Sequence, residues 1–283
     1  MHELNLKSQT ISYAEDWMPV QQRLVIKTME SLTGRGRLIQ RYRSFQNASF
    51  DNQTPDVWDI ALDHLGCRGP STERLLLPRR ESTRGLLLIA NHPFGVTDGV
   101  TLAWIASRID PNFRIIANGV LRQEPSLNPN ILPIEFQPGR QAKKINVKTR
   151  RTSIQTLKSG GVVALFPAGS VSWSKRSDEP VEDDPWKPLV SRLIKNSGCD
   201  VLPIYFKGSN SDLFQRASRL GITLRLGLYM HEIRRQLNIP IEFNVLPVIG
   251  HECIPNFSEP EMALWLRGQL TSGNGINSSS PDT

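Results

Sequence analysis

The sequence predicts an α/β protein with a mostly parallel, partly mixed central sheet, flanked by helices and preceded by a helical N-terminal extension. From residue 85 onward, short runs that are apolar on both faces alternate with stretches of helical periodicity. This is the pattern of strands buried between two layers of helices. Before residue 70, apolar residues instead recur at helical spacing. The last two expected strands have little helix between them, so we expect a mixed sheet.

Short strands and intervening helices account for most of the alternating region. Strands are expected at Leu86–Ala90, Arg114–Ala117, Ile131–Phe136, Gly161–Phe166, Val201–Phe206, Ile222–Met230 and Ile241–Ile249. Helices are expected at Thr97–Ile109, Lys148–Lys158, Pro185–Asn196 and Glu259–Gln269. The chain then divides into an N-terminal extension (1–70), an α/β domain (71–258), and a C-terminal helix and tail (259–283). The tail is rich in Ser, Gly and Asn from Ser272 and is expected to be disordered.

The N-terminal extension is expected to hold basic amphipathic helices. Apolar residues within Gln21–Phe45 recur at helical spacing among Arg and Lys, and Gly34 and Gly36 are expected to divide them into two helices. A further helix is expected between Thr54 and Gly66. An apolar face flanked by cations can lie in a membrane interface. The alternative is an ordinary surface helix that packs on the protein's own core.

Composition and charge indicate a globular protein with an anionic partner. The 283 residues, 39% hydrophobic and 22% charged, are enough for a large core. A net charge of +7 suits nucleic acid, anionic lipid or an acidic carrier. No apolar run approaches the ~18 residues of a membrane span, and no signal-peptide pattern is evident, so a soluble or peripheral protein is expected. Cys67, Cys199 and Cys253 form no CxxC pair and are expected to be reduced thiols in the cytosol.

A histidine and an aspartate flank the loop after the first expected strand, within Asn91-His92-Pro93-Phe94-Gly95-Val96-Thr97-Asp98-Gly99. Histidine exchanges a proton near neutral pH, and a carboxylate can fix its tautomer and stabilise its cation. Gly95 permits the loop to fold back so that Asp98 reaches His92. Free N–H groups of the following helix would favour developing negative charge. On this segment alone, a structural turn histidine with Asp98 as a helix cap is the alternative.

Other loops with cations, glycines or hydroxyls follow further expected strands. Arg122 and Arg140 each come shortly after a strand, and the strand that ends at Phe166 is followed by Pro167, Gly169, Ser170 and Ser172. A glycine lets backbone N–H groups approach a ligand closely. Because ligands of open α/β sheets bind at the carboxyl ends of strands, these loops are expected to meet at one edge. Their convergence favours a functional site over a set of unrelated turns.

Together these loops resemble the motif blocks of the glycerolipid acyltransferase family, which includes the 1-acylglycerol-3-phosphate acyltransferases. That family has a His-x4-Asp block, a block ending in Arg, a Phe-Pro-Glu-Gly block and a later apolar block with Pro, which Val201–Phe206 resembles. The order and approximate spacing match over residues 71 to about 250. Asn-His-Pro-x-Gly and Phe-Pro-Ala-Gly are most similar to the hemolysin-like or ornithine-lipid acyltransferase subgroup. The resemblance implies a glycerol-3-phosphate acyltransferase-like fold.

The chain departs from the family pattern in three places. Five residues separate His92 from Asp98 rather than four, Ala168 replaces the usual Glu, and Val171 stands where an Arg is usual. A cation or hydroxyl nearby would have to compensate for that Arg, from among Ser170, Ser172, Lys175 and Arg176. These changes argue against a glycerol-3-phosphate-type headgroup. They suit an acceptor such as a lyso-ornithine lipid or a lysophospholipid.

The resemblance implies direct acyl transfer to a lyso-lipid hydroxyl. His92 would take the hydroxyl proton, the oxygen would attack a thioester of acyl carrier protein or CoA, and Asp98 would hold the imidazole. Arg122 and Arg140 would anchor the acceptor headgroup or a donor phosphate. The other expected substrate-binding residues are Asn91, Gly95, Phe166, Pro167, Gly169, Ser170 and Ser172. No cofactor besides the donor and no metal is expected. The expected location is the cytoplasm, peripherally attached to an anionic membrane at its inner face.

Other classes of function fit less well. A non-catalytic module that binds lipid or carrier on the same fold is the main alternative, because the His92–Asp98 loop is longer than usual. Nucleic-acid binding is disfavoured because aromatic residues make up only 7% and do not interleave with the basic ones. A serine hydrolase would need a Gly-x-Ser-x-Gly elbow. The remaining histidines show no paired metal-ligand spacing; they are His2, His64, His231 and His251.

Overall fold

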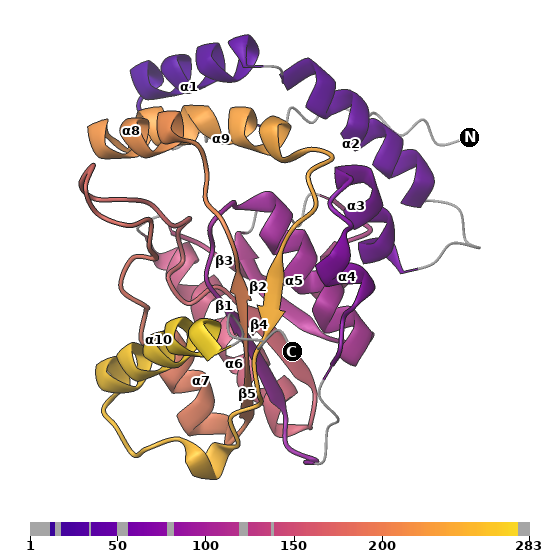
Figure 1. Cartoon of the computed structure of the whole chain (residues 1–283), viewed down its shortest axis with the longest axis vertical. Helices are drawn as coiled ribbons and strands as arrows, with labels where there is room; N and C mark the ends of the chain where they lie inside the picture. Colours follow the sequence, from indigo (N-terminus) through magenta and orange to yellow (C-terminus); the bar gives the residue numbers. More distant parts are fainter. Residues whose placement is uncertain are drawn as a thin grey trace, which may run out of the picture.

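The computed structural model describes residues 12–14, 18–33, 35–49, 56–77, 82–118, 124–136 and 139–276. It confirms the α/β class, with a single sheet between two layers of helices and further helices across one end (Figure 1). Gly34, Thr54 and Arg122, on which predictions were made, lie outside the described residues.

Among the described residues, the central sheet has six strands in the order β3-β2-β4-β1-β5-β6. They are β1 (Leu86–Ala90), β2 (Arg114–Asn118), β3 (Ile131–Ile134), β4 (Val162–Leu165), β5 (Asp200–Phe206) and β6 (Phe243–Val245). All neighbouring pairs are parallel except β5 and β6, which confirms the mixed sheet. Since β1 pairs with β4 on one side and β5 on the other, the residue after Ala90 leaves the middle of the sheet.

Helices cover both faces of the sheet. One face carries α3 (Val57–Leu65) and α5 (Val96–Ile109), and its core includes Leu86, Leu88, Trp58 and Leu102. The other carries α6 (Arg140–Lys158), α7 (Leu189–Ser197) and α10 (Glu259–Ile276), and its core includes Leu87, Ile89, Val190 and Leu266. Successive residues of β1 thus enter opposite cores, which explains why this strand is apolar throughout. The short helix α4 (Pro70–Glu73) joins the first face to β1.

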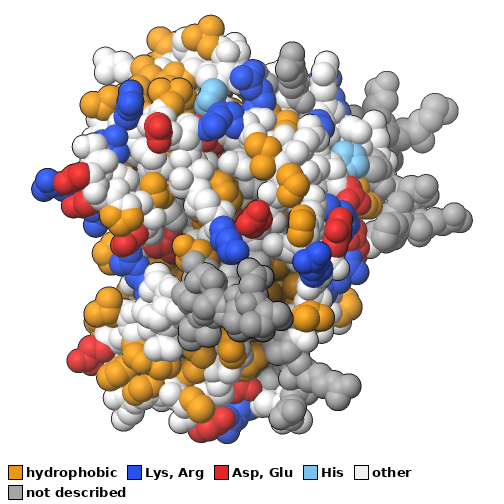
Figure 2. Space-filling view, viewed as in Figure 1, with side chains coloured by type: hydrophobic (Ala, Val, Ile, Leu, Met, Phe, Trp, Pro, Cys, Tyr) orange, Lys and Arg blue, Asp and Glu red, His pale blue; other side chains and the backbone are white. Residues whose placement is uncertain are grey.

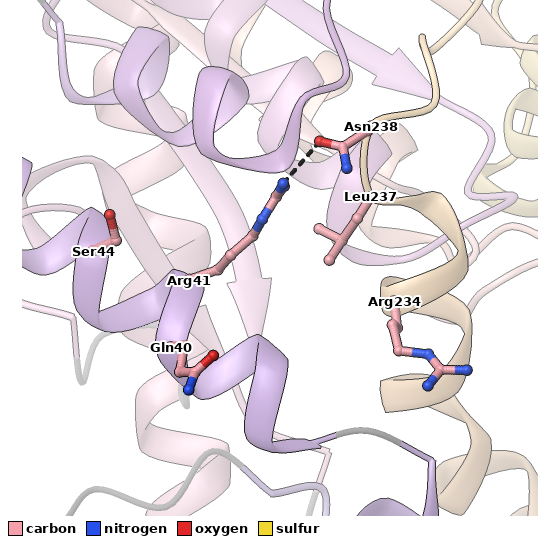
Figure 3. A pocket seen from close by; sticks show the side chains of 6 residues that line it. All are labelled: Gln40, Arg41, Ser44, Arg234, Leu237 and Asn238. Carbon is pink, nitrogen blue, oxygen red and sulfur yellow. Dashed lines mark hydrogen bonds between the residues drawn. The ribbon is translucent and has the colours of Figure 1, made fainter.

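The segment Gln21–Phe45 of the N-terminal extension lies in two helices, α1 (Val20–Leu32) and α2 (Arg35–Ser49), as predicted, although Gly36 lies inside α2, and the further helix expected between Thr54 and Gly66 is α3. α1 packs along α9 (Ile222–Gln236) so closely that a Cβ on Gly227 would collide with Met29. α2 packs on α3, and Arg41 of α2 bonds to the His64 carbonyl and the Asn238 side chain at a surface pocket of about 470 Å³ (Figure 3). The extension is therefore fixed to the protein's own helices by one side.

One predicted strand is wrong: Ile222–Met230 forms the first half of helix α9. The segment alternates apolar and polar residues at first, which mimics a strand. In the structure, Leu224 and Leu228 lie one helical turn apart and pack with Phe214 of α8 (Asp212–Leu220), a helix that the sequence did not predict. Burial of this helical face against α1 and α8 outweighs the local pattern.

Several helix and strand ends differ from the prediction. α6 begins at Arg140 rather than Lys148, because its first two turns are basic and offer little hydrophobic periodicity. α7 begins at Leu189 rather than Pro185, and β6 is shorter than Ile241–Ile249. α10 continues to Ile276, so the expected disordered tail does not begin at Ser272; residues 277–283 lie outside the described part of the chain.

Two further expectations concern cysteines and membrane spans. All three cysteines are free thiols, and burial raises the pKa of both Cys67 and Cys199 to about 11. Among the helices of the described ranges, none is both long and apolar enough to cross a membrane.

Candidate active site

The candidate site lies at the carboxyl end of β1, where Asn91 and His92 leave the sheet. The Asn91 side-chain amide donates to the Phe206 carbonyl at 2.8 Å, and its oxygen accepts the Phe206 N–H at 2.7 Å. These two bonds tie the first residue after β1 to the last residue of β5. Asn91, predicted to bind substrate, therefore uses its amide to fix the backbone that presents His92.

His92 and Asp98 meet, in spite of the extra residue between them. The His92 Nδ1 atom lies 3.2 Å from Asp98 Oδ2, and the Asp98 side chain is fully buried. The loop turns back at Gly95, whose φ of 105° is in the region that favours glycine. The approach is an electrostatic contact rather than an aligned hydrogen bond. It leaves Nε2 as the ring nitrogen available to act as a base.

Asp98 is held in place by the start of helix α5. Its carboxylate accepts the N–H groups of Phe94, Gly95 and Gly99 at 2.8–2.9 Å. Asp98 is thus both the cap of α5 and the partner of His92, two roles that the sequence offered as alternatives. The N–H groups of Phe94 and Gly95 already donate to Asp98, so these two groups are not the ones that would stabilise a negatively charged oxygen during acyl transfer.

The His92 ring and backbone are fixed by a second loop, which follows β4. The Phe166 ring stacks on the imidazole, with centroids 3.9 Å apart and planes 20° apart. The Ser172 N–H donates to the His92 carbonyl at 2.7 Å. Phe166 and Ser172, predicted to bind substrate, therefore contact the candidate base itself. The ring also covers one face of the imidazole and fixes its plane.

Asp183 was not predicted from the sequence. Together with Asn91, Asp98, Phe166 and Ser172 it holds His92 in place, and we call these six residues the His92 frame. Its Oδ1 accepts the His92 N–H at 3.1 Å and the Ser172 hydroxyl at 2.5 Å, and its Oδ2 accepts the Trp186 indole N–H at 2.9 Å. Burial raises the pKa of this carboxyl, an effect that the three donors and the charge of His92 oppose. The Asp183-Asp184-Pro185-Trp186 run was the available signal, but nothing in the sequence pairs it with His92.

The adjacent Asp184 makes matching bonds away from His92. It accepts the Ser170 hydroxyl at 2.7 Å and the Trp173 indole N–H at 3.2 Å. The hydroxyls of Ser170 and Ser172, predicted to contact substrate, are therefore both donors to neighbouring carboxylates. Pro167 and Gly169 shape the same loop: the Pro167 carbonyl accepts the Lys187 N–H, and Gly169 has a φ of 71°.

The two arginines that were predicted to anchor a substrate are Arg122 and Arg140. Arg140 is exposed at the first residue of α6, and Arg122 lies outside the described residues. Arg176, one candidate to replace the family arginine, pairs with Asp178 and Glu179 on the surface. Arg225 of α9 is buried and donates to the Val171 carbonyl, with its guanidinium 5.5 Å from the Trp173 ring. Arg225 therefore brings a cation to Val171, the position where the family usually has an arginine. It does so from a segment that was predicted to be a strand.

In the described part of the chain, neither a group of metal ligands nor either of two surface hollows involves His92. Within the described ranges, no cluster of three or more His, Cys, Asp or Glu side chains could hold a metal ion. The pocket between α2 and α9 (Figure 3) and a shallow hollow along α6 have no lining residue in common with the His92 frame.

The chain matches a known protein family and is similar to known proteins. Residues 69–242, which include the whole His92 frame, match the family model described as Acyltransferase. A lyso-glycine lipid O-acyltransferase of Bacteroides thetaiotaomicron is 30% identical over 190 residues, which cover 65% of this chain and 66% of that protein. A protein of the same name from Phocaeicola vulgatus is 29% identical over 133 residues, or 47% of this chain and 45% of that protein. The chain thus spans just under two thirds of the first relative and under half of the second.

Proposed function

The chain belongs to this acyltransferase family, as its motifs predicted, and on that premise we propose that it moves a fatty acyl group from a thioester to the hydroxyl of a lyso-lipid. The observation that carries the proposal is the His92 frame. A buried carboxylate lies 3.2 Å from Nδ1, and an aromatic ring covers one face of the imidazole. A structural turn histidine needs neither partner, whereas a general base needs both its orientation and its cation stabilised.

In the proposed reaction, His92 Nε2 takes the proton of the acceptor hydroxyl. The oxygen forms a bond to the thioester carbonyl carbon, and the carbon–sulfur bond then breaks. The departing thiolate takes the proton back from the imidazolium, so the enzyme returns to its starting state. Asp98 offsets the positive charge that His92 carries in between. No covalent enzyme intermediate and no cofactor besides the acyl donor are required.

For the acceptor, we propose a lyso-lipid with an amino-acid headgroup, of the lyso-ornithine or lyso-glycine type. Two observations support it over a glycerol-3-phosphate-type acceptor: Ala168 and Val171 replace the usual Glu and Arg, and both relatives are named for a lyso-glycine lipid. A lysophospholipid is the second candidate from the sequence. Arg122 and Arg140 stay the proposed anchors for the headgroup or a donor phosphate.

We propose that the protein docks peripherally on the inner face of an anionic membrane through a surface of α1, α8 and the start of α9. Apolar side chains gather there with Lys and Arg beside them, at the upper left of Figure 2. Leu24 and Leu32 of α1 are 66% and 80% exposed, and Leu220 of α8 is 77% exposed. Exposed apolar side chains flanked by cations are typical of helices that lie in a bilayer interface. The predicted docking element was the N-terminal extension (1–70), to which α1 belongs, and the proposed surface adds α8 and the start of α9 to it.

The test uses the purified full chain and its His92→Ala variant. Each receives palmitoyl carrier protein or palmitoyl-CoA with lyso-ornithine lipid, lyso-glycine lipid or lysophosphatidylethanolamine, and products are measured by mass spectrometry. We expect an acylated amino-acid lipid from the wild type and about 10³-fold less from the variant, since general base catalysis contributes 10²- to 10⁴-fold. Thermal unfolding checks that the variant is folded. Equal product from both, or none from either, would favour a non-catalytic module that binds lipid or carrier.

A further inference from the structure

One helix, α6, carries a large share of the positive charge of this protein. The chain has 34 Lys and Arg against 27 Asp and Glu, and seven of the 34 lie on α6, which carries no acidic residue. The other 27 basic residues are therefore equal in number to the 27 acidic residues. The net charge of +7 is, in number, the charge of α6 alone.

Most cations of α6 are exposed, and they form no ion pair with the described residues. Six of the seven are exposed, namely Arg140, Lys143, Lys144, Lys148, Arg151 and Lys158. In the described part of the chain no ion pair involves any of them, whereas surface arginines elsewhere pair with carboxylates, as in Arg192–Glu259 and Arg267–Glu182. A shallow hollow of about 550 Å³ runs along Lys144, Lys148 and Arg151. The fold keeps these charges available to a partner.

This helix begins at the edge of the sheet where His92 lies. β3 is parallel to β2, β4 and β1, so its carboxyl end and the start of α6 lie at the same edge as the end of β1. Phe136, between β3 and α6, packs against Gly169 of the loop that carries Phe166 and Ser172, 3.5 Å from where a Cβ would stand. A partner bound on the first turns of α6 would therefore sit beside the candidate site.

We propose that α6 is the docking surface for an acidic acyl carrier protein, which delivers the thioester to His92. This inference rests on the proposed function and adds the surface that would select the donor. The 19 residues of α6 form a stripe about 28 Å long, which matches the side of a small protein better than the phosphates of one CoA molecule. Opposite charge over such a stripe accelerates encounter and fixes orientation.

The character of the stripe argues for a protein partner over a bilayer. On α6, Val147 is the most exposed large apolar side chain, at 37% exposure. On the docking surface of α1 and α8, Leu24, Leu32 and Leu220 are 66–80% exposed. Binding in a membrane interface depends on buried apolar area as well as charge. The two surfaces thus offer a division of tasks: the apolar one meets the membrane, and the cationic one meets the carrier.

The test compares K144E/K148E with a charge-matched control, K195E/R234E, whose two cations are exposed on α7 and α9. Initial rates are measured with a palmitoyl carrier protein and with palmitoyl-pantetheine, which has the same thioester and no protein. For K144E/K148E we expect the KM for the carrier substrate to rise about tenfold or more, because charge complementarity acts mainly on association. With palmitoyl-pantetheine, we expect kcat/KM to change less than twofold, and the control to match the wild type with both donors.

Binding of the carrier, followed by fluorescence anisotropy, separates this inference from the proposed function. Wild type that binds the carrier, with K144E/K148E binding at least tenfold more weakly, supports the surface even if no donor is turned over. An unchanged KM and unchanged binding in K144E/K148E would overturn it, as would equal losses with both donors. Loss of binding to vesicles of phosphatidylethanolamine and phosphatidylglycerol, with carrier binding intact, would assign α6 to the membrane and overturn it too.

Discussion

The loop around His92 and the start of α6 lie at the same edge of the sheet, and the surroundings of His92 and the outer face of α6 are built in opposite ways. At His92, the backbone and one ring nitrogen have fixed neighbours: Asp183 accepts the N–H, Ser172 donates to the carbonyl, and Asp98 faces Nδ1. On α6, six of the seven cations are exposed, and none of the seven has an ionic partner among the described residues. The difference indicates two kinds of work. Catalysis needs one fixed geometry, and recognition of a carrier needs charges that are not already paired within the protein.

The comparison predicts that single changes in the His92 frame have large effects on turnover, and after His92 itself the largest is expected at Asp98. Asp98→Asn removes the negative charge beside Nδ1 and weakens the bonds to the Phe94, Gly95 and Gly99 N–H groups. We expect kcat/KM to fall about 10²-fold or more, since the partner of a catalytic histidine fixes its tautomer and its charge. We also expect about 1–2 kcal/mol less stability, from the weakened helix cap. Steady-state kinetics and urea unfolding measure both, and wild-type activity in a folded variant would contradict the account.

Asp183 and Asp184 offer a matched pair within the frame. Both accept a serine hydroxyl and an indole N–H, and only Asp183 accepts the His92 N–H. Asp183→Asn should lower kcat about tenfold, since a buried bond to a charged group contributes about 1.5–3 kcal/mol and Asn replaces only part of it. The KM for the lyso-lipid should stay the same, which a general loss of structure would not give. Asp184→Asn is the control and should stay within twofold of wild type; equal losses would make Asp183 merely structural.

Salt should separate the two regions without any substitution. Raising ionic strength screens the exposed cations of α6 and leaves the buried frame around His92 unaffected. From 0.05 to 0.5 M NaCl we expect the KM for a palmitoyl carrier protein to rise about fivefold, because steering between opposite charges weakens. The kcat/KM for palmitoyl-pantetheine should change little. The same salt dependence with both donors would mean that α6 does not distinguish them.

The smallest effect is expected for the ring that stacks on His92. Phe166→Leu keeps an apolar side chain and removes the aromatic face 3.9 Å from the imidazole. A cation–aromatic contact contributes about 0.5–1 kcal/mol at a partly exposed site, so we expect kcat to fall about threefold. Phe136→Leu, on the neighbouring loop, is the control for lost aromatic bulk. A loss of 10²-fold in Phe166→Leu would show that the ring acts through more than its stacking.

The parts of the fold that the sequence predicted are those with a strong local pattern. β1, β4 and β5 are apolar on both faces and fall within a residue of their predicted bounds. α9 was mistaken for a strand because its alternation is local, while the contacts of Leu224 and Leu228 with Phe214 that make it a helix come from tertiary packing. The first half of α6 was missed because cations replace the apolar residues that reveal a helix.

In the candidate site, too, the sequence predicted only what depends on a local pattern. His92 and Asp98 could be paired because they are close in sequence and Gly95 explains the turn between them. Asp183 stands 91 positions after His92, and nothing in either segment indicates that they meet. Arg225 likewise reaches Val171 only because α9 is a helix that packs over that loop. Contacts between distant segments depend on the order of the strands, which local patterns do not encode.

The central claim is that His92 and Asp98 act as one catalytic unit, and a double-mutant cycle tests it most directly. The kcat/KM with palmitoyl-pantetheine and the best lyso-lipid is measured for wild type, His92→Ala, Asp98→Asn and the double variant. If Asp98 acts through His92, the double variant should be no slower than His92→Ala, within about twofold, since residues that act as a unit are not additive. A double variant slower than His92→Ala by the full factor of Asp98→Asn would mean that the two residues act independently, and would contradict the account.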